Sequence, residues 1–282
     1  MKPALARSYL FVPGNRPERF SKAMAAGADA IVIDLEDAVP AADKPAARGF
    51  VRETLDAWQA AGQANACAVV VRVNGPDTTW FGDDLTALAS HPLLAGIMLP
   101  KAERRDDLAT VRRLAHQAMA ILPLVETARG MAEVSTLAAC PGVQRLVFGT
   151  LDFQLDLGID GDREELDPFR AQLVMASRLA SLAPPIDGVS TVLDDAARIE
   201  DDARRARRFG FGAKLCIHPR QVAPVHQAYA WSEDELAWAR RVLQAAGAGA
   251  AAQLDGKMID TPVILKARRI LGAAVPVPAS MP

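Results

Sequence analysis

The feature that most constrains the fold of this chain is an alternation of short β-branched apolar runs with longer segments of helical period. Such an alternation is typical of parallel strands joined by crossover helices. Eight runs are expected to form strands: Ser8–Val12, Ala30–Leu35, Ala68–Asn74, Ala95–Leu99, Met119–Val125, Gln144–Gly149, Ile186–Val189 and Ala213–Ile217. Eight strands at this spacing predict a closed (β/α)8 TIM barrel. An open doubly wound sheet is the alternative, but no GxGxxG turn follows a first strand, so dinucleotide binding has no support.

The residues after the eighth strand predict a separate C-terminal segment. Glu233–Ala246 has helical period, the small-residue run Gly247–Ala252 is typical of a hinge or linker, and Met258–Leu271 again carries apolar residues at helical spacing. We therefore expect a (β/α)8 barrel over residues 1–230, which carries the metal site, and a C-terminal helical extension or lid over residues 231–282. Because this tail is short, we expect it to lack a core of its own and to pack as a lid on the barrel or on a neighbouring subunit.

Composition favours small-molecule chemistry. The chain has 32 basic and 34 acidic side chains among 282 residues, with half of all residues apolar, so no net field attracts nucleic acid or an anionic membrane. No run of roughly 18 apolar residues predicts a membrane span. Three cysteines lie far apart among apolar neighbours, namely Cys67, Cys140 and Cys216. They fit reduced core thiols better than disulfides, which predicts a soluble, unexported protein in the cytoplasm.

Polar residues follow five of the predicted strands. In a (β/α)8 barrel the reactive groups lie at the carboxyl ends of the strands. The strand ends read Asp34-Leu35-Glu36-Asp37, Arg72-Val73-Asn74, Pro100-Lys101-Ala102-Glu103, Glu126-Thr127-Ala128-Arg129 and Gly149-Thr150-Leu151-Asp152. Several carboxylates and an arginine are therefore expected to converge on the barrel mouth.

Glu126 and Asp152 follow adjacent predicted strands and are candidate metal ligands. Magnesium takes few protein carboxylates together with water and substrate oxygens, whereas zinc prefers His and Cys, which are missing at these strand ends. Each acid taken alone is better explained as a helix cap, since carboxylates are stabilised at helix N-termini. Two acids on neighbouring strands favour a magnesium site.

Arg72 lies within the apolar run Val69–Val73, where a permanent charge needs an anion or a carboxylate partner. Substrate binding and a structural ion pair to Asp34 or Glu36 are equally compatible with the local sequence. Asp37 and Glu36 are candidates to orient a metal-bound water, to hold Arg72 or to begin a helix. Residue patterns do not rank four other polar side chains near strand ends: Lys101, Glu103, Lys214 and His218.

Eight blocks taken together make the chain recognisable: Arg7–Asn15, Asp34–Val39, Arg72–Asn74, Leu99–Glu103, Val125–Ala128, Gly149–Asp152, Ile217–Pro219 and Gly256–Asp260. They occur in order over nearly the whole chain, and this pattern resembles the citrate lyase beta-subunit family within the HpcH/HpaI aldolase group. The resemblance implies a (β/α)8 barrel, usually trimeric, that binds Mg2+ through Glu126 and Asp152 and substrate through Arg72. It also implies a C-terminal segment that covers a neighbouring subunit's site and delivers Asp260 as the acid–base residue.

The resemblance also implies an activity. Members of the family cleave citryl-, malyl- or citramalyl-coenzyme A, and some hydrolyse the thioester instead. We expect a magnesium-dependent carbon–carbon lyase that releases acetyl-CoA and a keto acid or glyoxylate, with Glu126, Arg72, Glu36 and Asp37 around the acid part of the substrate. Coenzyme A would lie along the rim, where positive charge comes from Arg7, Arg16 and Lys22.

Other interpretations remain open. A malyl-CoA-type thioesterase fits the same blocks, and a metal-dependent aldolase that releases pyruvate without coenzyme A would share the metal pair and Arg72. A non-catalytic barrel would have lost strand-end charges, yet all are present. Asp260 precedes Thr261 and Pro262, so it also suits a helix cap. Partner alpha and acyl-carrier subunits are further possibilities that the residues do not decide.

Overall fold

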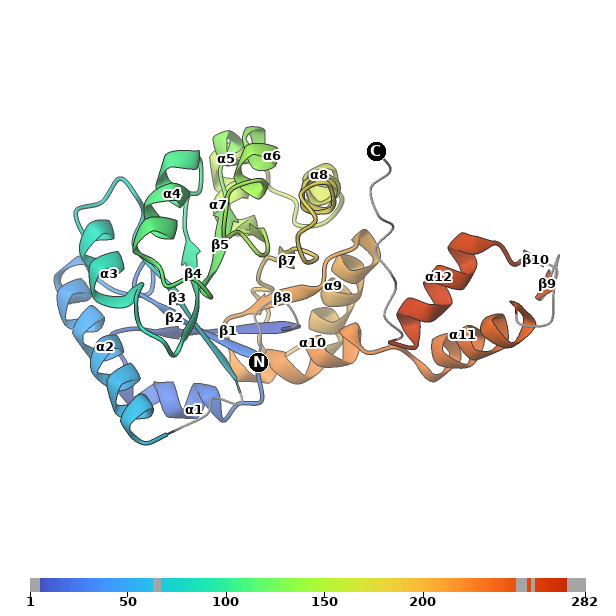
Figure 1. The fold of residues 1–282 in the computed structure, drawn as a ribbon, viewed down its shortest axis with the longest axis horizontal. Coiled ribbons are helices and arrows are strands. Elements are labelled where there is room, and N and C mark those ends of the chain that lie inside the picture. The colour runs from blue at the N-terminus through green and yellow to red at the C-terminus, as the bar shows by residue number, and fades with distance from the viewer. Residues whose placement is uncertain (1–5, 63–66, 247–252, 255–256, 273–282) are drawn as a thin grey trace. The chain divides into compact units, whose positions relative to one another are not determined.

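The first part of the chain forms a closed barrel of eight parallel strands that pair in sequence order (Figure 1). The structure is a computed structural model that describes residues 6–62, 67–246, 253–254 and 257–272. The strands are β1 (Ser8–Pro13), β2 (Ala30–Asp34), β3 (Ala68–Arg72), β4 (Leu94–Leu99), β5 (Ala120–Val125), β6 (Val147–Phe148), β7 (Ile186–Asp187) and β8 (Ala213–Cys216). β8 returns to pair with β1, which closes the barrel. The predicted (β/α)8 fold is confirmed.

Strands β6 and β7 are shorter than the apolar runs that predicted them. Each has two residues in regular ladder pairing. The flanking backbone still makes parallel contacts, because Gln144 N donates to Ile121 O at 3.1 Å and Ile186 N donates to Leu146 O at 2.9 Å. The apolar runs thus mark where the chain lies in the barrel wall rather than the length of the ladder.

Helices surround the barrel and cover the outer side of its strands. They are α1 (Phe20–Met24), α2 (Lys44–Ala60), α3 (Phe81–Leu88), α4 (Arg105–Leu114), α5 (Ala128–Ala132), α6 (Val134–Ala138), α7 (Thr150–Leu157), α8 (Asp167–Leu179), α9 (Ala196–Phe209) and α10 (Val222–Tyr229). In α2, the side chains of Ala47, Val51 and Leu55 recur every four residues and are fully buried. Each large aliphatic side chain buried this way contributes about 1.5–3 kcal/mol to stability.

Alternation along the strands produces two separate apolar layers. On β2, Ile31 and Ile33 belong to the layer between strands and helices, whereas Ala30 and Val32 belong to the barrel interior. The interior is packed with buried side chains up to Leu124 and Leu215. Above that level the barrel opens into a cavity, so the packed interior serves as the floor of the site described below.

Residues from Ala230 onward form a second compact unit. Its described elements are α11 (Glu233–Ala246), the antiparallel hairpin of β9 (Gln253–Leu254) and β10 (Lys257–Met258), and α12 (Thr261–Ile270). Ala239, Val242, Ala267 and Ile270 form its buried cluster. The expectation that this segment lacks a core is therefore wrong, because α11 and α12 bury apolar faces on each other.

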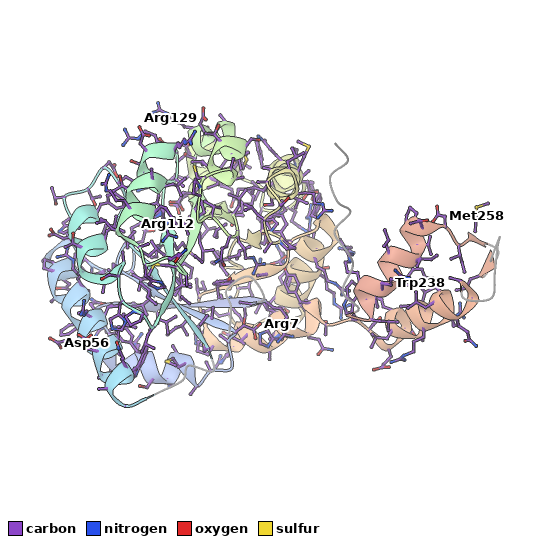
Figure 2. All side chains as sticks on the ribbon, viewed as in Figure 1. Arg7, Asp56, Arg112, Arg129, Trp238 and Met258 are labelled. Carbon is purple, nitrogen blue, oxygen red and sulfur yellow. The ribbon has the colours of Figure 1, made fainter. Side chains whose placement is uncertain are left out.

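Two other expectations for the C-terminal segment concern a hinge and a lid. The predicted hinge at Gly247–Ala252 lies outside the described residues, and the lid role stays a prediction. Met258, at the tip of the second unit in Figure 2, is 73% exposed.

Two expectations from composition can be compared with the described residues. All three cysteines are buried and free, as expected for core thiols: Cys67, Cys140 and Cys216. Within the described part of the chain, none of the helices is both long and apolar enough to cross a membrane.

Candidate active site

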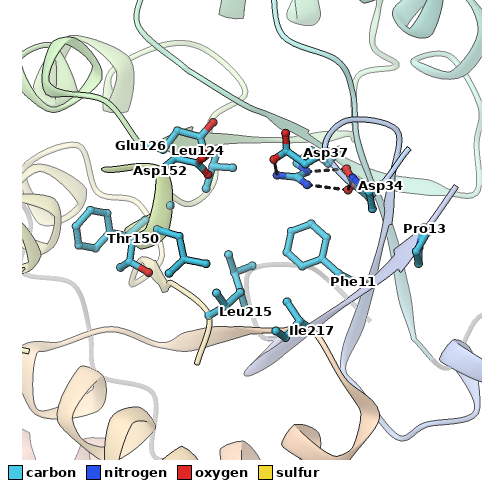
Figure 3. A pocket seen from close by; sticks show the side chains of 16 residues that line it. Phe11, Pro13, Asp34, Asp37, Leu124, Glu126, Thr150, Asp152, Leu215 and Ile217 are labelled. Carbon is cyan, nitrogen blue, oxygen red and sulfur yellow. Dashed lines mark hydrogen bonds and ion pairs between the residues drawn. The ribbon is translucent and has the colours of Figure 1, made fainter. Parts of the chain in front are cut away.

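A cavity of about 400 Å³ opens at the carboxyl ends of the strands. Its lining combines acidic residues, one arginine and an apolar wall: Phe11, Pro13, Asp34, Asp37, Ala38, Arg72, Leu124, Glu126, Phe148, Gly149, Thr150, Leu151, Asp152, Val189, Leu215 and Ile217. Figure 3 shows Glu126 and Asp152 close together, with Asp34 and Asp37 across the cavity from them. Of the strand-end residues that the sequence singled out, the cavity lining therefore contains Asp34, Asp37, Arg72, Glu126 and Asp152, but not Glu36, Asn74, Lys101, Glu103 and Arg129.

Glu126 directly follows β5 and is almost completely buried, with 2% of its surface exposed. Its Oε1 accepts a hydrogen bond from the backbone N–H of Lys101 at 2.8 Å. A Cβ atom on Gly149 would lie 2.6 Å from both the Cβ and the Oε2 of Glu126. The Gly149 position therefore has to lack a side chain, because only then does the Glu126 carboxylate fit beside β6.

Lys101 contributes to the site in a way that the sequence did not reveal. Its φ of +46° lies in the left-handed region, which is uncommon for a residue other than glycine. This backbone conformation is the one in which the Lys101 N–H meets Glu126. The Lys101 ammonium lies 3.7 Å from Glu36 Oε1. A lysine after a proline gives no sequence signal for positive φ, so pattern alone could not find this role.

Three carboxyl groups at the mouth hold protons more tightly than usual. Burial, together with the nearby charge of Glu36, raises the pKa of Glu126 to about 8. Burial also raises the pKa of Glu36 to about 7, against the opposing effect of Arg72. The pKa of Asp152 is raised by burial and by the charge of Asp37. Because the positive charge nearby does not compensate these carboxylates, the mouth is suited to a cation.

Arg72 is the main positive charge of the cavity and is surrounded by acids. Its Nε and Nη2 each donate to Asp34 at 2.7 Å, in a two-pronged contact. Its Nη1 lies 3.0 Å from Glu36 Oε2 and donates to Asp37 Oδ2 at 3.2 Å. The ion pairs considered from the sequence are therefore present, and the substrate-binding role of Arg72, Glu36 and Asp37 stays a prediction.

The donor set of the cavity fits a hard cation. Glu126 and Asp152, which we call the acidic pair, supply oxygen ligands, and the cavity lining contains no His or Cys. Within the described residues, no three His, Cys, Asp or Glu side chains are grouped tightly enough to hold a metal by themselves. Two carboxylates suit magnesium, which takes its other ligands from water and substrate.

The three predicted coenzyme A contacts do not lie together. Arg7 precedes β1, and its Nε donates to Asp29 Oδ2 at 3.0 Å, next to the start of β2. This is the amino-terminal end of the barrel, and Arg7 and Arg129 lie on opposite sides of the first unit in Figure 2. The prediction that Arg7 belongs to the rim of the mouth is therefore wrong. Arg16, just after β1, and Lys22 in α1 are exposed and keep that role as a prediction.

Two further predicted residues have local structural contacts. Asp260 caps α12, since its Oδ1 accepts a hydrogen bond from Val263 N at 3.2 Å. The cap is the alternative that its neighbours Thr261 and Pro262 suggested. His218 caps the 3₁₀ turn Pro219–Gln221 through a hydrogen bond that its Nδ1 accepts from Arg220 N. A capping hydrogen bond does not test whether Asp260 transfers a proton, so its acid–base role stays a prediction.

A second group of buried charges joins Asp187 at the end of β7, Lys214 within β8 and Arg170 in α8. Lys214 Nζ donates to Asp187 Oδ2 at 3.0 Å, and Arg170 Nε donates to Asp187 Oδ1 at 3.1 Å. These three residues, which we call the neutralised cluster, border a smaller cavity of about 130 Å³. Burial alone would raise the pKa of Asp187, but Lys214 and Arg170 outweigh it and hold that pKa below its usual value. Lys214 is thus part of a structural ion-pair network.

Residues 7–219 match the model of the HpcH/HpaI aldolase/citrate lyase family. This chain belongs to that family. The match covers the barrel and all of the cavity residues described above, which agrees with the resemblance seen in the sequence blocks.

Relatives within the family carry different names. The citrate lyase subunit beta-like protein of Deinococcus radiodurans is 37% identical to this chain, over 95% of this chain and 97% of its own length. The (3S)-malyl-CoA thioesterase of Cereibacter sphaeroides is 33% identical, over 95% and 94% of the two chains. The family thus includes relatives of similar likeness named for a lyase subunit and for a thioesterase.

A solved structure in the family has the same fold. The CitE protein of Mycobacterium tuberculosis, solved with magnesium, acetoacetate and coenzyme A, superposes with a TM-score of 0.82. It is 33% identical in sequence, and the match covers 96% of this chain and 98% of that one.

Proposed function

We propose that this protein is a magnesium-dependent carbon–carbon lyase that cleaves a 3-hydroxyacyl-CoA thioester of the citryl-, malyl- or citramalyl-CoA type. The products would be acetyl-CoA and a keto acid or glyoxylate. The observation that carries this proposal is the acidic pair: buried Glu126 directly after β5 and the more exposed Asp152 in the first turn of α7 after β6, both with raised pKa values, in a cavity that also contains Arg72. The M. tuberculosis structure with magnesium and coenzyme A supports it.

Glu126 and Asp152 would hold the magnesium ion, which when bound supplies Lewis-acid stabilisation of the substrate's hydroxyl and carboxylate oxygens. The Lys101 N–H and the space left by Gly149 fix the Glu126 carboxylate before substrate arrives. Arg72, held by Asp34 on one edge, would direct its remaining N–H toward the oxygen on which charge develops. Glu36 and Asp37 would orient Arg72 beside the substrate.

Cleavage removes the hydroxyl proton, breaks the bond between the second and third carbons, and leaves an enolate that must gain a proton at the second carbon. Asp260 is the proposed acid–base residue, delivered when the second unit covers a barrel mouth, that of a neighbouring subunit in a homotrimer. Such closure would also exclude water from the reacting atoms. Arg16 and Lys22 would contact the phosphates of coenzyme A. Alpha and acyl-carrier subunits are further proposed partners.

A thioesterase is the second candidate, and the 33% identity to the (3S)-malyl-CoA thioesterase favours it. The same acidic pair and Arg72 would then bind the acid part while water attacks the thioester carbonyl. A metal-dependent aldolase that releases pyruvate without coenzyme A would need neither Arg16 nor Lys22.

One assay separates these functions. Citryl-, malyl-, methylmalyl- and citramalyl-CoA and the corresponding free hydroxy acids are each incubated with the protein and magnesium, and the short acyl-CoA product (acetyl-CoA, or propionyl-CoA from the methylmalyl ester), free coenzyme A and the keto acid or glyoxylate are measured. Release of acetyl-CoA with a keto acid or glyoxylate is the expected result. Release of free coenzyme A with the intact hydroxy acid would identify a thioesterase. Cleavage of the free hydroxy acids alone would identify the aldolase.

A further inference from the structure

The charges that line the cavity are strongly unbalanced. Four acids face it, namely Asp34, Asp37, Glu126 and Asp152, and Arg72 is the single cation among the described lining residues. The neighbouring Lys101 lies outside this lining and is directed toward Glu36 at 3.7 Å. Any negative charge that the acid part of a substrate brings into this cavity must therefore be met by the bound metal or by Arg72.

Arg72 has little capacity left for a substrate carboxylate. A guanidinium carries five N–H groups. Two of them, on Nε and Nη2, donate to Asp34, and the two on Nη1 face Glu36 and Asp37. One N–H on Nη2 remains, enough for a single oxygen atom but too few for the two-pronged contact that an arginine makes with a carboxylate.

The other side of the cavity is apolar. Phe11, Val189, Leu215 and Ile217, which we call the apolar side, come from β1 and from the ends of β7 and β8. In the view of Figure 3 the labelled acids lie in the upper part of the cavity, and Phe11, Leu215 and Ile217 lie below them. This side offers contact area for a methyl group and has no donor or positive charge in its side chains for a carboxylate.

These properties of the cavity determine which substituent it can accept at the one position where the candidate substrates differ. The carbon that becomes the ketone carries a hydroxyl, a carboxylate and one variable substituent, which is hydrogen in a malyl, methyl in a citramalyl and carboxymethyl in a citryl ester. The proposed metal accounts for the hydroxyl and one carboxylate. A carboxymethyl substituent would bring a second carboxylate into a cavity without a free cation, where burying an unpaired charge is strongly unfavourable.

From these contacts we infer that the site selects a hydroxyacyl group with a small apolar substituent, so that the keto acid released is a monocarboxylate of the pyruvate type rather than a dicarboxylate of the oxaloacetate type. This inference rests on the proposed function, and it names the substrate class within it. A methyl substituent that packs against the apolar side should also raise kcat/KM for the citramalyl ester over that for the malyl ester. The expected ratio is about 10-fold for one added carbon in an apolar pocket.

The test uses binding of the free keto acids, so that neither turnover nor coenzyme A affects the result. Pyruvate and oxaloacetate are titrated into the magnesium-loaded full-length protein by calorimetry. Pyruvate is expected to bind at least about 10-fold more tightly, because the second carboxylate of oxaloacetate has no cationic partner. Equal binding, tighter binding of oxaloacetate, or no binding of pyruvate would overturn the inference.

A charge introduced on the apolar side sharpens the test. Ile217 is 44% exposed, and its backbone N–H donates to Gln221, so its side chain can be changed without loss of that hydrogen bond. Ile217→Lys should reduce the preference for pyruvate over oxaloacetate at least about 10-fold, because it supplies the missing cation. The matched control Ile217→Met should keep the preference. A preference that is unchanged in Ile217→Lys would count against the inference.

The outcomes for the two proposals are distinguishable. Preference for pyruvate without cleavage of any CoA ester would refute the lyase and leave the selectivity standing. Cleavage of citryl-CoA as efficient as that of citramalyl-CoA would leave the lyase standing and overturn the selectivity.

Discussion

The acidic pair and the neutralised cluster lie at the same end of the same barrel, and each contains a buried carboxyl group, Glu126 in one and Asp187 in the other, yet the pKa values of these two groups shift in opposite directions. The pKa of Glu126 is raised to about 8, chiefly by burial, with Glu36 adding to it. Asp187 is also fully buried, but Lys214 and Arg170 lower its pKa. The difference comes from the cations placed beside each carboxylate, since burial is common to both.

This comparison separates structural charges from functional ones. A buried carboxylate matched by two cations within 3.1 Å completes its own site and needs no further ligand. Carboxylates that lie close together without such partners, one of them buried, repel each other in the metal-free protein and favour binding of a cation. The predictions below test whether this difference in compensation corresponds to a difference in role.

The largest effect is expected for Glu126→Gln. The amide keeps the shape of the side chain and an oxygen that can accept from Lys101 N, but it carries no charge for the metal. Turnover of the best substrate should fall at least about 1000-fold while the circular dichroism spectrum is unchanged. Glu103→Gln is the matched control, because Glu103 contacts Thr127 outside the cavity lining, and it should remain active. Normal turnover of Glu126→Gln would contradict the metal-binding role of Glu126. Full activity of the unmodified protein in excess chelator would contradict the need for a metal.

Lys214→Met is expected to act on stability instead. It removes one of the two cations that hold Asp187 and leaves a buried charge only partly paired, which typically costs about 3–5 kcal/mol in the free energy of unfolding. Urea denaturation measures this change.

Adding Asp187→Asn to Lys214→Met should restore part of the loss, since the unpaired charge is then gone. Glu126→Gln should not destabilise the metal-free protein, because the acidic pair lacks such compensation. A stability loss of equal size in Glu126→Gln and Lys214→Met would contradict the comparison.

The third prediction concerns a carboxylate outside both groups. Asp260→Asn keeps the capping oxygen that accepts from Val263 N, so α12 should remain folded. If Asp260 transfers the proton at the substrate carbon, lyase turnover should fall by about 100-fold or more, the usual size of general acid–base catalysis. Magnesium affinity should not change. Wild-type turnover on a substrate proven for the parent enzyme would leave Asp260 with its cap alone.

The sequence predicted the barrel and the acidic pair because both follow from periodicity. Alternating strands and helices define the barrel. Glu126 stands directly after one apolar run, and Asp152 follows the next run after a short turn. The sequence could not distinguish the structural Asp187 from Glu126, since each is an acid at a strand end. Only the ion pairs that Asp187 makes with Lys214 and Arg170 show the difference.

Positions set by backbone geometry were also beyond sequence reasoning. The positive φ of Lys101 is not favoured by its residue type, so its hydrogen bond to Glu126 had no sequence signal. Arg7 is basic and close to β1 in sequence, which alone predicts a place at the mouth. It precedes that strand, however, and one strand length separates the two ends of the barrel.

The smallest expected effect is a pH dependence of stability that magnesium reverses. The pKa of Glu126 is about 8 in the folded protein against 4.5 as its ordinary value, so the folded state holds this proton more tightly than the unfolded state does. Stability from Glu126 is therefore fully present below about pH 4.5 and is lost as the pH rises through about 8. Glu36 and Asp152 act in the same direction, since their pKa values are also raised.

Magnesium binds the deprotonated carboxylates, so its stabilising effect should grow over the same pH range. Thermal unfolding of the metal-free protein should show a melting temperature that falls by a few degrees between about pH 6 and pH 8.5, while saturating magnesium removes most of the fall. Glu126→Gln should reduce the pH dependence of the melting temperature both without and with magnesium. Asp187 cannot produce this pattern, because its lowered pKa makes its contribution vanish only in acid. A magnesium effect that is independent of pH would show that the acidic pair is already ionised in the metal-free protein, and the contrast with the neutralised cluster would then lose its physical basis.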